Sequence, residues 1–413
     1  MPLILFLVLL AADVHATMLV NRQQFLSTQV LPEGLWTFGV SHGRWTSTAG
    51  SYGDNGKLQG NRDYFSRDVD YDAMTDEISD PLERELARAA FNVYERSGKE
   101  VAGRAVNDVD VQQNSNTYVL GRGLTKRSSL FIAVPVVTLK TSIRSRFVAG
   151  ESLNRLTSEL RSEGQYAQAE EIIERSRNAL NERLAETGYN SDFPSELTTV
   201  ANIYLTHRYE NVAGRKARWS AESALVIPAG KSSDVDDFLY LRINEEQYSF
   251  RQSGTLAFDA HPRLRLLTNA YYHFRFPFEK SRRIPVNSTS PLSSDIDPST
   301  QVRYGDSYGA SAQTNFMFTD STTFYGGVSR EFRGADKVSG DRYSSRRYDY
   351  LEQNTTQELD TAYVGVTHNT IQSFLAKKFP IPVDANLQYS ATTAGKNAFA
   401  SQAVALTMLV FYK

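Results

Sequence analysis

The chain contains no cysteine among its 413 residues, which excludes disulfides and thiolate metal sites. It also lacks an excess of either charge, with a formal net charge of −2, and this argues against a nucleic-acid partner. Beyond the first residues it has no apolar run of about eighteen residues, the length that a membrane-spanning helix needs. The mean hydropathy of −0.41 likewise excludes a helical membrane protein. It does not exclude a membrane β-barrel, because only alternate residues of each strand face lipid.

The N-terminus has the features of an export signal. Residues 3–12 form an apolar run too short to span a bilayer as a helix, and Val14-His15-Ala16 supplies small residues where a signal peptidase cleaves. A basic n-region is missing. We therefore predict a signal peptide at 1–16 and a periplasmic segment at 17–34, with a buried N-terminal strand as the alternative.

The last residues alternate strictly. Apolar side chains share one face at a period of two, which predicts a strand and not a helix: Val404, Leu406, Met408, Val410 and Tyr412. This pattern resembles the C-terminal strand of bacterial outer-membrane β-barrels, although Lys413 follows the aromatic residue here. The resemblance implies that Tyr412 and Phe411 form part of the signal read by the barrel-assembly machinery. A closing strand of a soluble β-sandwich is the alternative.

Eleven further strands precede this one, and the turns between them alternate between short and long. We predict strands at 35–45, 118–124, 130–147, 197–209, 217–227, 248–260, 264–278, 304–318, 322–332, 361–368 and 381–391. An even number places both termini on one side of a membrane. The long connections (46–116, 148–195, 228–246, 279–303 and 333–358) then all fall on the opposite side. The predicted fold is all-β, a transmembrane antiparallel up-and-down β-barrel of about twelve strands spanning 35–413, with helical insertions in external loops.

The strand predicted at 264–278 shows which face meets lipid. Leucine and aromatic residues alternate with arginine, asparagine and histidine along it. An arginine facing lipid at the bilayer midplane costs roughly 2–4 kcal/mol, so the charged set must face inward. In a soluble sheet, the alternative, a second sheet would have to cover the aromatic face.

The predicted lumen is rich in arginine. By strand alternation, the candidates for contact with a permeant are Arg122, Arg144, Arg208, Arg218, Glu222, Arg251, Arg263, Arg265 and Arg275, and the same set includes Arg146, Glu210 and Asp259. Guanidinium groups suit the carboxylate or phosphate of a permeant. The alternative is that these are paired charges that fill a narrow barrel.

Two segments interrupt the β pattern. Ser79-Asp80-Pro81 opens a predicted helix at 79–96, and 150–187 has apolar residues at helical spacing with a break at Gly164. Both lie in predicted external loops. They can form a lid over the pore or pack as surface helices, and a partner-binding role is the third alternative.

Several short motifs resemble those of one barrel group. They are Ser-Ser-Leu-Phe-Ile-Ala-Val-Pro at 128–135, Ala-Leu-Val-Ile-Pro-Ala-Gly-Lys at 224–231 with an acidic loop at 234–237, Phe276-Pro277, and Gly-Lys-Asn at 395–397. This pattern is similar to the long-chain fatty-acid transporters and to barrels of the phenol-degradation meta pathway. The resemblance implies an outer-membrane channel for hydrophobic or amphipathic molecules. The chain departs from the group in its helical insert at 150–187 and in lacking the Asn-Pro-Ala signature of the transporters' N-terminal hatch.

No enzyme, cofactor or metal site is predicted. None of the histidines after the predicted signal peptide has a serine or aspartate at a spacing typical of a hydrolase: His42, His207, His261, His273 and His368. The acidic runs at 68–72 and 234–237 lack the spacing of an EF-hand loop.

The sequence as a whole therefore predicts a monomeric barrel in the outer membrane of a Gram-negative bacterium. We expect it to pass small amphipathic or hydrophobic molecules by passive diffusion, and to contact outer-membrane lipid, lipopolysaccharide and the assembly machinery. The alternative function is that of a structural barrel with a closed lumen, whose external helical loops bind a partner.

Overall fold

The computed structural model describes residues 29–60, 67–71, 100–167, 187–189, 195–212, 216–230, 234–236, 246–286 and 293–412, with isolated positions between these ranges. The predicted signal peptide and most of the segment at 17–34 lie outside the described residues. In the parts described, no helix is both long enough and apolar enough to cross a bilayer.

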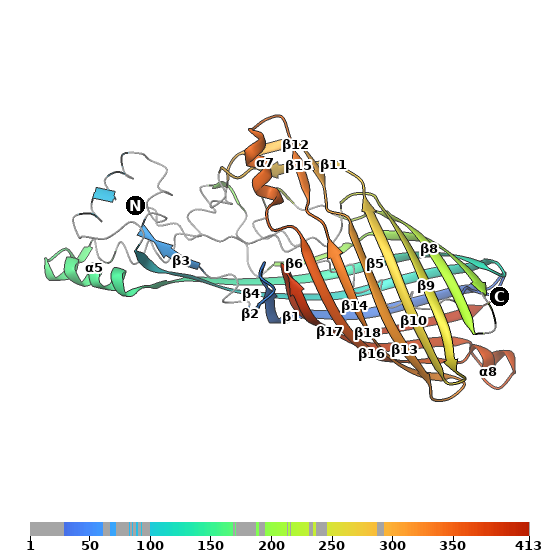
Figure 1. The fold of residues 1–413 in the computed structure, drawn as a ribbon. Coiled ribbons are helices and arrows are strands. Elements are labelled where there is room, and N and C mark those ends of the chain that lie inside the picture. The colour runs from blue at the N-terminus through green and yellow to red at the C-terminus, as the bar shows by residue number, and fades with distance from the viewer. Residues whose placement is uncertain are drawn as a thin grey trace.

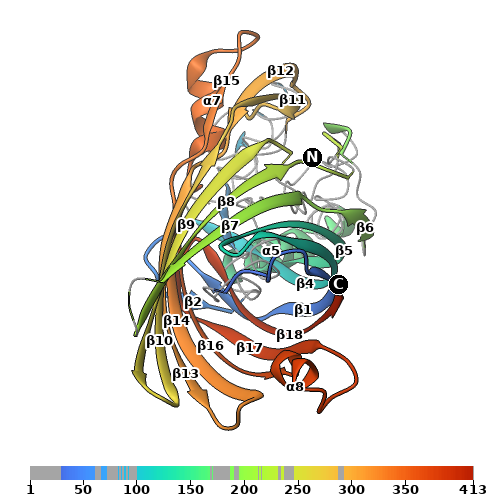
Figure 2. The same ribbon diagram turned by 90° about the vertical axis from the view of Figure 1, so that its right-hand side faces the viewer.

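Twelve antiparallel strands close into one barrel (Figures 1 and 2). In chain order they are β1 (Trp36–Tyr52), β4 (Val101–Thr125), β5 (Ser128–Ala149), β7 (Ile203–Val212), β8 (Ala217–Ile227), β9 (Ser249–His261), β10 (Leu264–Arg275), β13 (Ser307–Met317), β14 (Thr322–Arg333), β16 (Gln357–Asn369), β17 (Val383–Lys396) and β18 (Ala398–Tyr412). Each strand pairs with the next in this list, and β1 pairs with both β4 and β18 to close the wall. β6 (Ser195–Val200) pairs with β5 ahead of β7. The predicted fold and strand number are confirmed.

The two ends of the barrel differ. Short connections at 126–127, 262–263 and 318–321 lie at one end, together with the C-terminus and the short helix α8 (Ile371–Leu375) (Figure 1). Trp36, the first residue of β1, lies opposite Tyr412, so both ends of the barrel sequence meet there. We call this the short-turn end. The long connections all lie at the opposite end, which agrees with the parity argument from the sequence.

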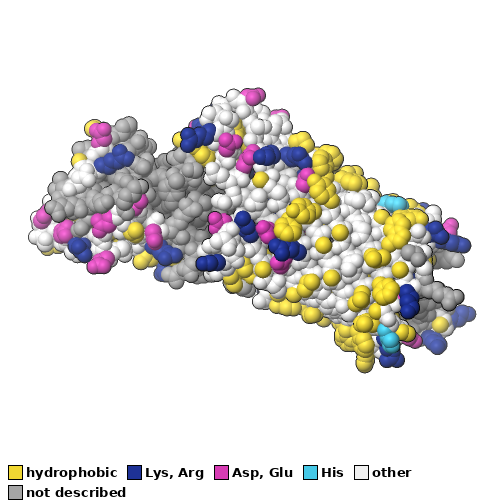
Figure 3. All heavy atoms as spheres, in the orientation of Figure 1, with side chains coloured by type: hydrophobic (Ala, Val, Ile, Leu, Met, Phe, Trp, Pro, Cys, Tyr) yellow, Lys and Arg dark blue, Asp and Glu magenta, His cyan; other side chains and the backbone are white. Residues whose placement is uncertain are grey.

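The outer face is apolar and the inner face polar. Exposed outward side chains near the short-turn end include Phe258, Leu266, Phe316 and Phe324, and those farther along include Tyr272 and Tyr308. On the wall shown in Figure 3, hydrophobic side chains gather in two groups with a paler zone between them. Serine, threonine and glutamine alternate with them on the inner face. Two aromatic girdles around an apolar belt are typical of a membrane barrel.

The terminal aromatic pair is split between these faces. Tyr412 points outward at the short-turn end and is about half exposed, whereas Phe411 points inward and is buried. The outward position of Tyr412 fits a girdle residue. The assembly role of the pair stays a prediction.

The strand predicted at 264–278 ends earlier than expected. β10 stops at Arg275, because Pro277 has no backbone N–H to donate to the next strand. The chain then enters a separate three-stranded sheet made of β11 (Phe278–Arg283), β12 (Ile296–Arg303) and β15 (Lys337–Ser339). With α7 (Ser345–Glu352) this sheet forms a unit that we call the cap, at the long-loop end (Figures 1 and 2). Its core consists of Ile284, Val302, Tyr304, Val338 and Tyr348.

β4 and β5 are longer than predicted and continue past the barrel as a ribbon, which the short strand β3 (Arg67–Asp70) joins by pairing with the start of β4 (Figure 1). Beyond Thr141, the last β5 residue paired with β6, residues of β5 pair only with β4. The ribbon leads into α5 (Glu151–Ser162), which buries Leu153, Leu156 and Leu160 and ends before Gly164, as the sequence predicts. Of the helix predicted at 79–96 only isolated positions are described, and each of them is helical. In the second half of the helix predicted at 150–187, Tyr166, Ala167, Glu170 and Thr187 are described and are helical. The other positions of that half, and those of the helix predicted at 79–96, lie outside the described residues.

Candidate functional site: the barrel lumen

The structure places the predicted lumen arginines in different environments. Arg122, Arg144 and Arg146 lie away from the lumen. Arg122 points outward, because Val119, Gly121 and Gly123 take the inward positions of β4. Its guanidinium lies 4.9 Å from the ring centre of Trp36, in the girdle at the short-turn end. The prediction from the sequence that Arg122 faces the lumen is therefore wrong. An arginine stem can cover apolar surface while its charged group reaches the water interface.

Arg144 lies in the ribbon. It lies opposite Asp108, in the part of β5 beyond Thr141, where β5 pairs only with β4. Arg146 lies in the same part. Neither residue therefore lies in the closed part of the wall. The sequence prediction placed them in the lumen because it ended the barrel wall later along β5.

Two of the predicted lumen arginines, Arg263 and Arg265, lie at the short-turn end. Arg263 lies in the exposed turn between β9 and β10, not on a strand. Arg265 points inward and its Nε donates to Asp259 at 2.6 Å, with both side chains about one-quarter exposed. The charge of Arg265 is thus neutralised within the wall.

Arg275 is fully buried at the other end of β10. Its Nη1 donates to the backbone oxygen of Gly305 at 2.6 Å and to Ser307 Oγ at 3.2 Å, and its backbone N–H donates to Asp306. These bonds hold the chain at 304–306, where the predicted strand at 304–318 is replaced by an irregular segment before β13. Arg275 therefore joins β10 to the start of β13 and is not exposed to a permeant.

Arg208 and Glu222 form a buried ion pair at 2.9 Å on the inner faces of β7 and β8. The pair also holds the chain before β1. Arg208 donates to the backbone oxygen of Gln29, Val30 N–H donates to Glu210, and Leu31 N–H donates to Ser129 Oγ at 2.7 Å. We call residues 29–35 the strap. It binds inward-facing side chains of β5 and β7, so it enters the barrel at the short-turn end.

The strap packs against Gly123 on the inner face of β4. A Cβ on Gly123 would lie 2.0 Å from the backbone oxygen of Pro32, so no other residue fits there without displacing the strap. Gly34 has a φ of +75°, which favours glycine, and its N–H donates to the oxygen of Gly123. Sequence reasoning did not find this contact. The glycines at 34, 121 and 123 were the available signal, but they do not reveal which segment approaches them.

Arg251 lies on the inner face in a different environment. Its guanidinium is 4.3 Å from the ring centre of Tyr271, whose hydroxyl donates to Glu331. No carboxylate in the described structure lies within ion-pair distance of Arg251, and its buried Nε has no hydrogen-bond partner. Arg218 shares the inward face of β8 with Ser220 and Glu222 and is half-buried. Arg251 is thus a lumen cation stacked on an aromatic ring.

A second polar group lies nearer the short-turn end. The hydroxyl of Tyr325 donates to Gln388 Oε1 at 3.0 Å, and Asn386 Nδ2 donates to Tyr325 at 2.9 Å. Both β17 residues point inward. This group was not predicted from the sequence, because its side chains are neutral and only charged residues marked the predicted lumen.

One histidine–serine contact has the spacing of a base and a nucleophile but is closed to solvent. His273 Nε2 lies 2.8 Å from Ser249 Oγ, but Ser249 is fully buried, so no substrate can reach that hydroxyl. Within the described residues, no three histidine, aspartate or glutamate side chains are grouped as metal ligands.

Comparison with known proteins supports the architecture. No protein-family model matches the sequence, and neither does any curated protein sequence. An outer membrane channel from Pseudomonas putida F1 is similar in structure, with a TM-score of 0.54, 12% identity, and coverage of 94% of this chain and 98% of that one. This likeness concerns the fold.

Two further structures match more distantly. A Pseudomonas aeruginosa FadL homologue gives a TM-score of 0.34 at 8% identity, covering 92% of this chain and 90% of that chain. The Ralstonia pickettii toluene transporter TbuX gives 0.32 at 10% identity, covering 93% and 90%.

The structure therefore has the fold of an outer-membrane β-barrel. A closed antiparallel barrel leaves no unpaired strand edge, and its apolar belt between aromatic girdles faces lipid. It belongs in the outer membrane of a Gram-negative bacterium.

Proposed function

We propose that the protein is an outer-membrane channel through which small amphipathic molecules diffuse passively. The observation that carries this proposal is Arg251 stacked on Tyr271 on the inner wall of a closed barrel, a cation that pairs with no carboxylate among the described residues. Such a pair offers a ring face to the apolar part of a permeant and guanidinium donors to its anionic end. The inward amides and hydroxyl around Tyr325 continue a hydrogen-bonding path toward the short-turn end.

In this proposal the short-turn end faces the periplasm and the strap narrows that mouth. The buried Arg208–Glu222 pair then has a supporting role, because it holds the strap and does not contact the permeant. The permeant-contacting set reduces from nine candidates to Arg251, with Arg218 near the periplasmic mouth.

Single-channel recording in planar bilayers tests the proposal. Wild-type protein should give steady currents, and Arg251→Gln should shift the reversal potential in a salt gradient away from anion preference, since one lumen cation is lost. Arg122→Gln is the matched control, because Arg122 faces outward and its loss should leave the reversal potential unchanged. Heat-modifiable gel mobility should show that both variants fold.

A second variant separates a strapped channel from a closed barrel. Gly123→Val should displace the strap and raise conductance, whereas Gly254→Val, at an outward glycine with open space around it, should not. If wild type and Gly123→Val are both silent, the channel proposal fails and the closed structural barrel takes its place.

A further inference from the structure

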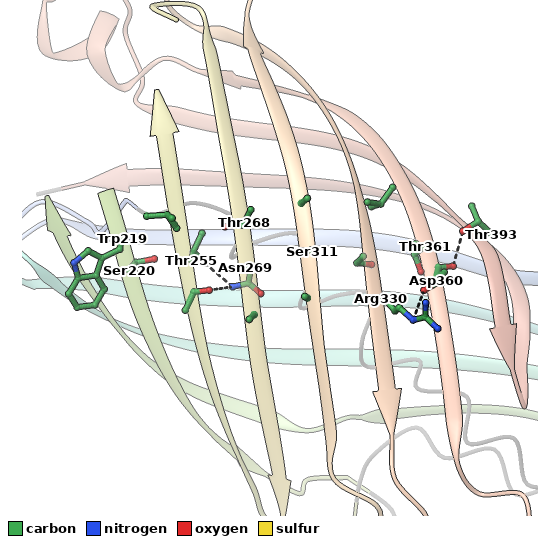
Figure 4. A pocket seen from close by; sticks show the side chains of 17 residues that line it. Trp219, Ser220, Thr255, Thr268, Asn269, Ser311, Arg330, Asp360, Thr361 and Thr393 are labelled. Carbon is green, nitrogen blue, oxygen red and sulfur yellow. Dashed lines mark hydrogen bonds and ion pairs between the residues drawn. The ribbon is translucent and has the colours of Figure 1, made fainter. Parts of the chain in front are cut away.

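One feature that the channel does not use lies on the outside of the wall. A cavity of about 920 Å³ crosses β8, β9, β10, β13, β14 and β16 and reaches β17, with Trp219 at one end and Asp360 and Thr393 at the other (Figure 4). Leu256 and Val328 line it and are 50% and 59% exposed on the outward face. We call this cavity the outer groove.

The groove exists because the wall carries small side chains there. Ala270 lies opposite both Gly254 and Ala310, and Thr268 lies opposite Ala312. On the same outward faces, larger residues stand on either side along the strands, among them Phe258 and Phe316 toward one end and Tyr272 and Tyr308 toward the other. The floor is thus set back by about the length of an aromatic side chain, and the volume is within the ~300–1,000 Å³ of pockets that hold small ligands.

A charged cluster closes one end of the groove. Arg330 lines the groove and bonds Glu358 at 3.1 Å and Asp360 at 3.6 Å, with all three side chains between 34% and 56% exposed. Lys396 lies opposite Glu358 in the β16–β17 ladder and therefore shares its outward face. The cluster is next to the outer girdle, where the Arg330 guanidinium stacks over Phe332 at 4.8 Å. Two cations and two carboxylates thus face the outside of the wall at the height of lipid headgroups.

We propose that the outer groove binds one phosphorylated glycolipid of the outer leaflet. Its acyl chain lies along the alanine floor between Trp219 and Val328, and its phosphate meets Arg330 and Lys396. An apolar trough beside two outward-facing cations suits an amphiphile with a phosphate head. Because Glu358 and Asp360 balance the charge of the cluster, the phosphate binds through direct charge-assisted bonds to Arg330 and Lys396 and not through net attraction. The site is on the lipid side of the wall, so it is independent of transport through the lumen.

The test uses purified barrel in phosphatidylcholine nanodiscs that contain lipid A, with bound lipid A counted by native mass spectrometry. Wild-type protein should retain lipid A. Ala312→Phe, which fills the floor, and Arg330→Gln, which removes the main cation, should each lower retention at least fivefold. Val364→Phe is the matched control, because Val364 faces outward on β16 but does not line the groove, and it should retain lipid A like wild type.

Dephosphorylated lipid A separates the two halves of the site. The wild type should retain it less well than lipid A, Arg330→Gln should cause no further loss, and Ala312→Phe should still lower retention. Equal retention of lipid A by wild type and Ala312→Phe would overturn the proposal, as would equal retention of both lipids by wild type. Currents of the same variants in planar bilayers should be unchanged, so failure here does not bear on the channel.

Discussion

Arginine has three different roles in this barrel, and its partners decide which. Arg122 stacks on Trp36 in the outer girdle, Arg275 binds backbone oxygen in a buried turn, and Arg251 stacks on Tyr271 in the lumen. Strand alternation read from the sequence alone places all three on the inward face. The physical difference comes from the segment that lies opposite, which strand alternation does not specify.

Replacing Arg275 by glutamate should destabilise the fold and leave selectivity almost untouched. The new carboxylate would lie fully buried beside the oxygens of Gly305 and Asp306, and an uncompensated buried charge costs about 3–5 kcal/mol. The temperature at which heat-modifiable mobility is lost should fall clearly below that of the wild type. Arg263→Glu, in an exposed turn, is the control and should match the wild type. A stable Arg275→Glu barrel with altered reversal potential would return this residue to the permeant path.

The sequence could identify which arginines of β7 to β10 point inward, but not which of them are free of an ion pair and can contact a permeant. Arg208, Arg251 and Arg265 point inward as alternation predicts. That Glu222 and Asp259 neutralise two of them depends on strand register, which the sequence alone leaves open. The strap could not be predicted from the sequence either, because its hydrogen bonds to β5 and β7 join residues that are 98 to 180 positions apart.

Among the elements, the cap contains a buried hydrogen bond that links its helix to its sheet. Tyr348 of α7 donates to Asp297 of β12, and both side chains are almost fully buried. Burial alone would raise the pKa of Asp297. The hydrogen bonds from Tyr348 and Ser299 and the charge of Arg342 outweigh it and hold that pKa below its usual range. A carboxyl with a lowered pKa stabilises the folded cap above its unfolded pKa, and this stability is lost as the pH falls through the folded value.

Replacing Tyr348 by phenylalanine should therefore weaken the cap at pH 7 and lessen its dependence on acid. Losing a hydrogen bond to a buried charged group costs on the order of 1–3 kcal/mol. Amide hydrogen exchange in β15 and α7 should be faster in the variant at pH 7, and the difference from wild type should shrink toward pH 3. Tyr350→Phe on the same helix is the control. A difference that stays constant with pH would mean that Asp297 is not the group involved.

The bounds of strands inside the apolar belt could be predicted from the sequence, whereas the strand extensions beyond the belt at the long-loop end could not. β8 matches its predicted bounds, 217–227, because its tight turn and alternating faces both mark it. Where β4 leaves the wall for the ribbon, it carries Asn114, Gln112 and Asp110 at positions that alternate with its inward residues. Away from lipid nothing requires an apolar outward face, so a polar strand there looks like a loop.

For the whole molecule, orientation remains the main prediction. In the proposed topology the cap, the ribbon and α5 face the cell exterior and the short turns face the periplasm. An epitope inserted at Gly164, where a φ of +80° and open space around the residue mark an exposed turn, should be labelled on intact cells. An epitope inserted at Arg263, in the turn between β9 and β10, should be labelled only after the outer membrane is disrupted. The reverse pattern would invert the barrel.

The ribbon also sets how the protein meets its surroundings. Residues 142–149 of β5 continue past the last barrel contact, and at ~3.4 Å per residue they extend roughly 27 Å farther before α5 begins. With that end outward, an approaching antibody, phage fibre or neighbouring cell would touch the ribbon tip before the mouth of the barrel. Immune or phage pressure would then act on the ribbon and α5, while the strands in the membrane would change only as folding allows.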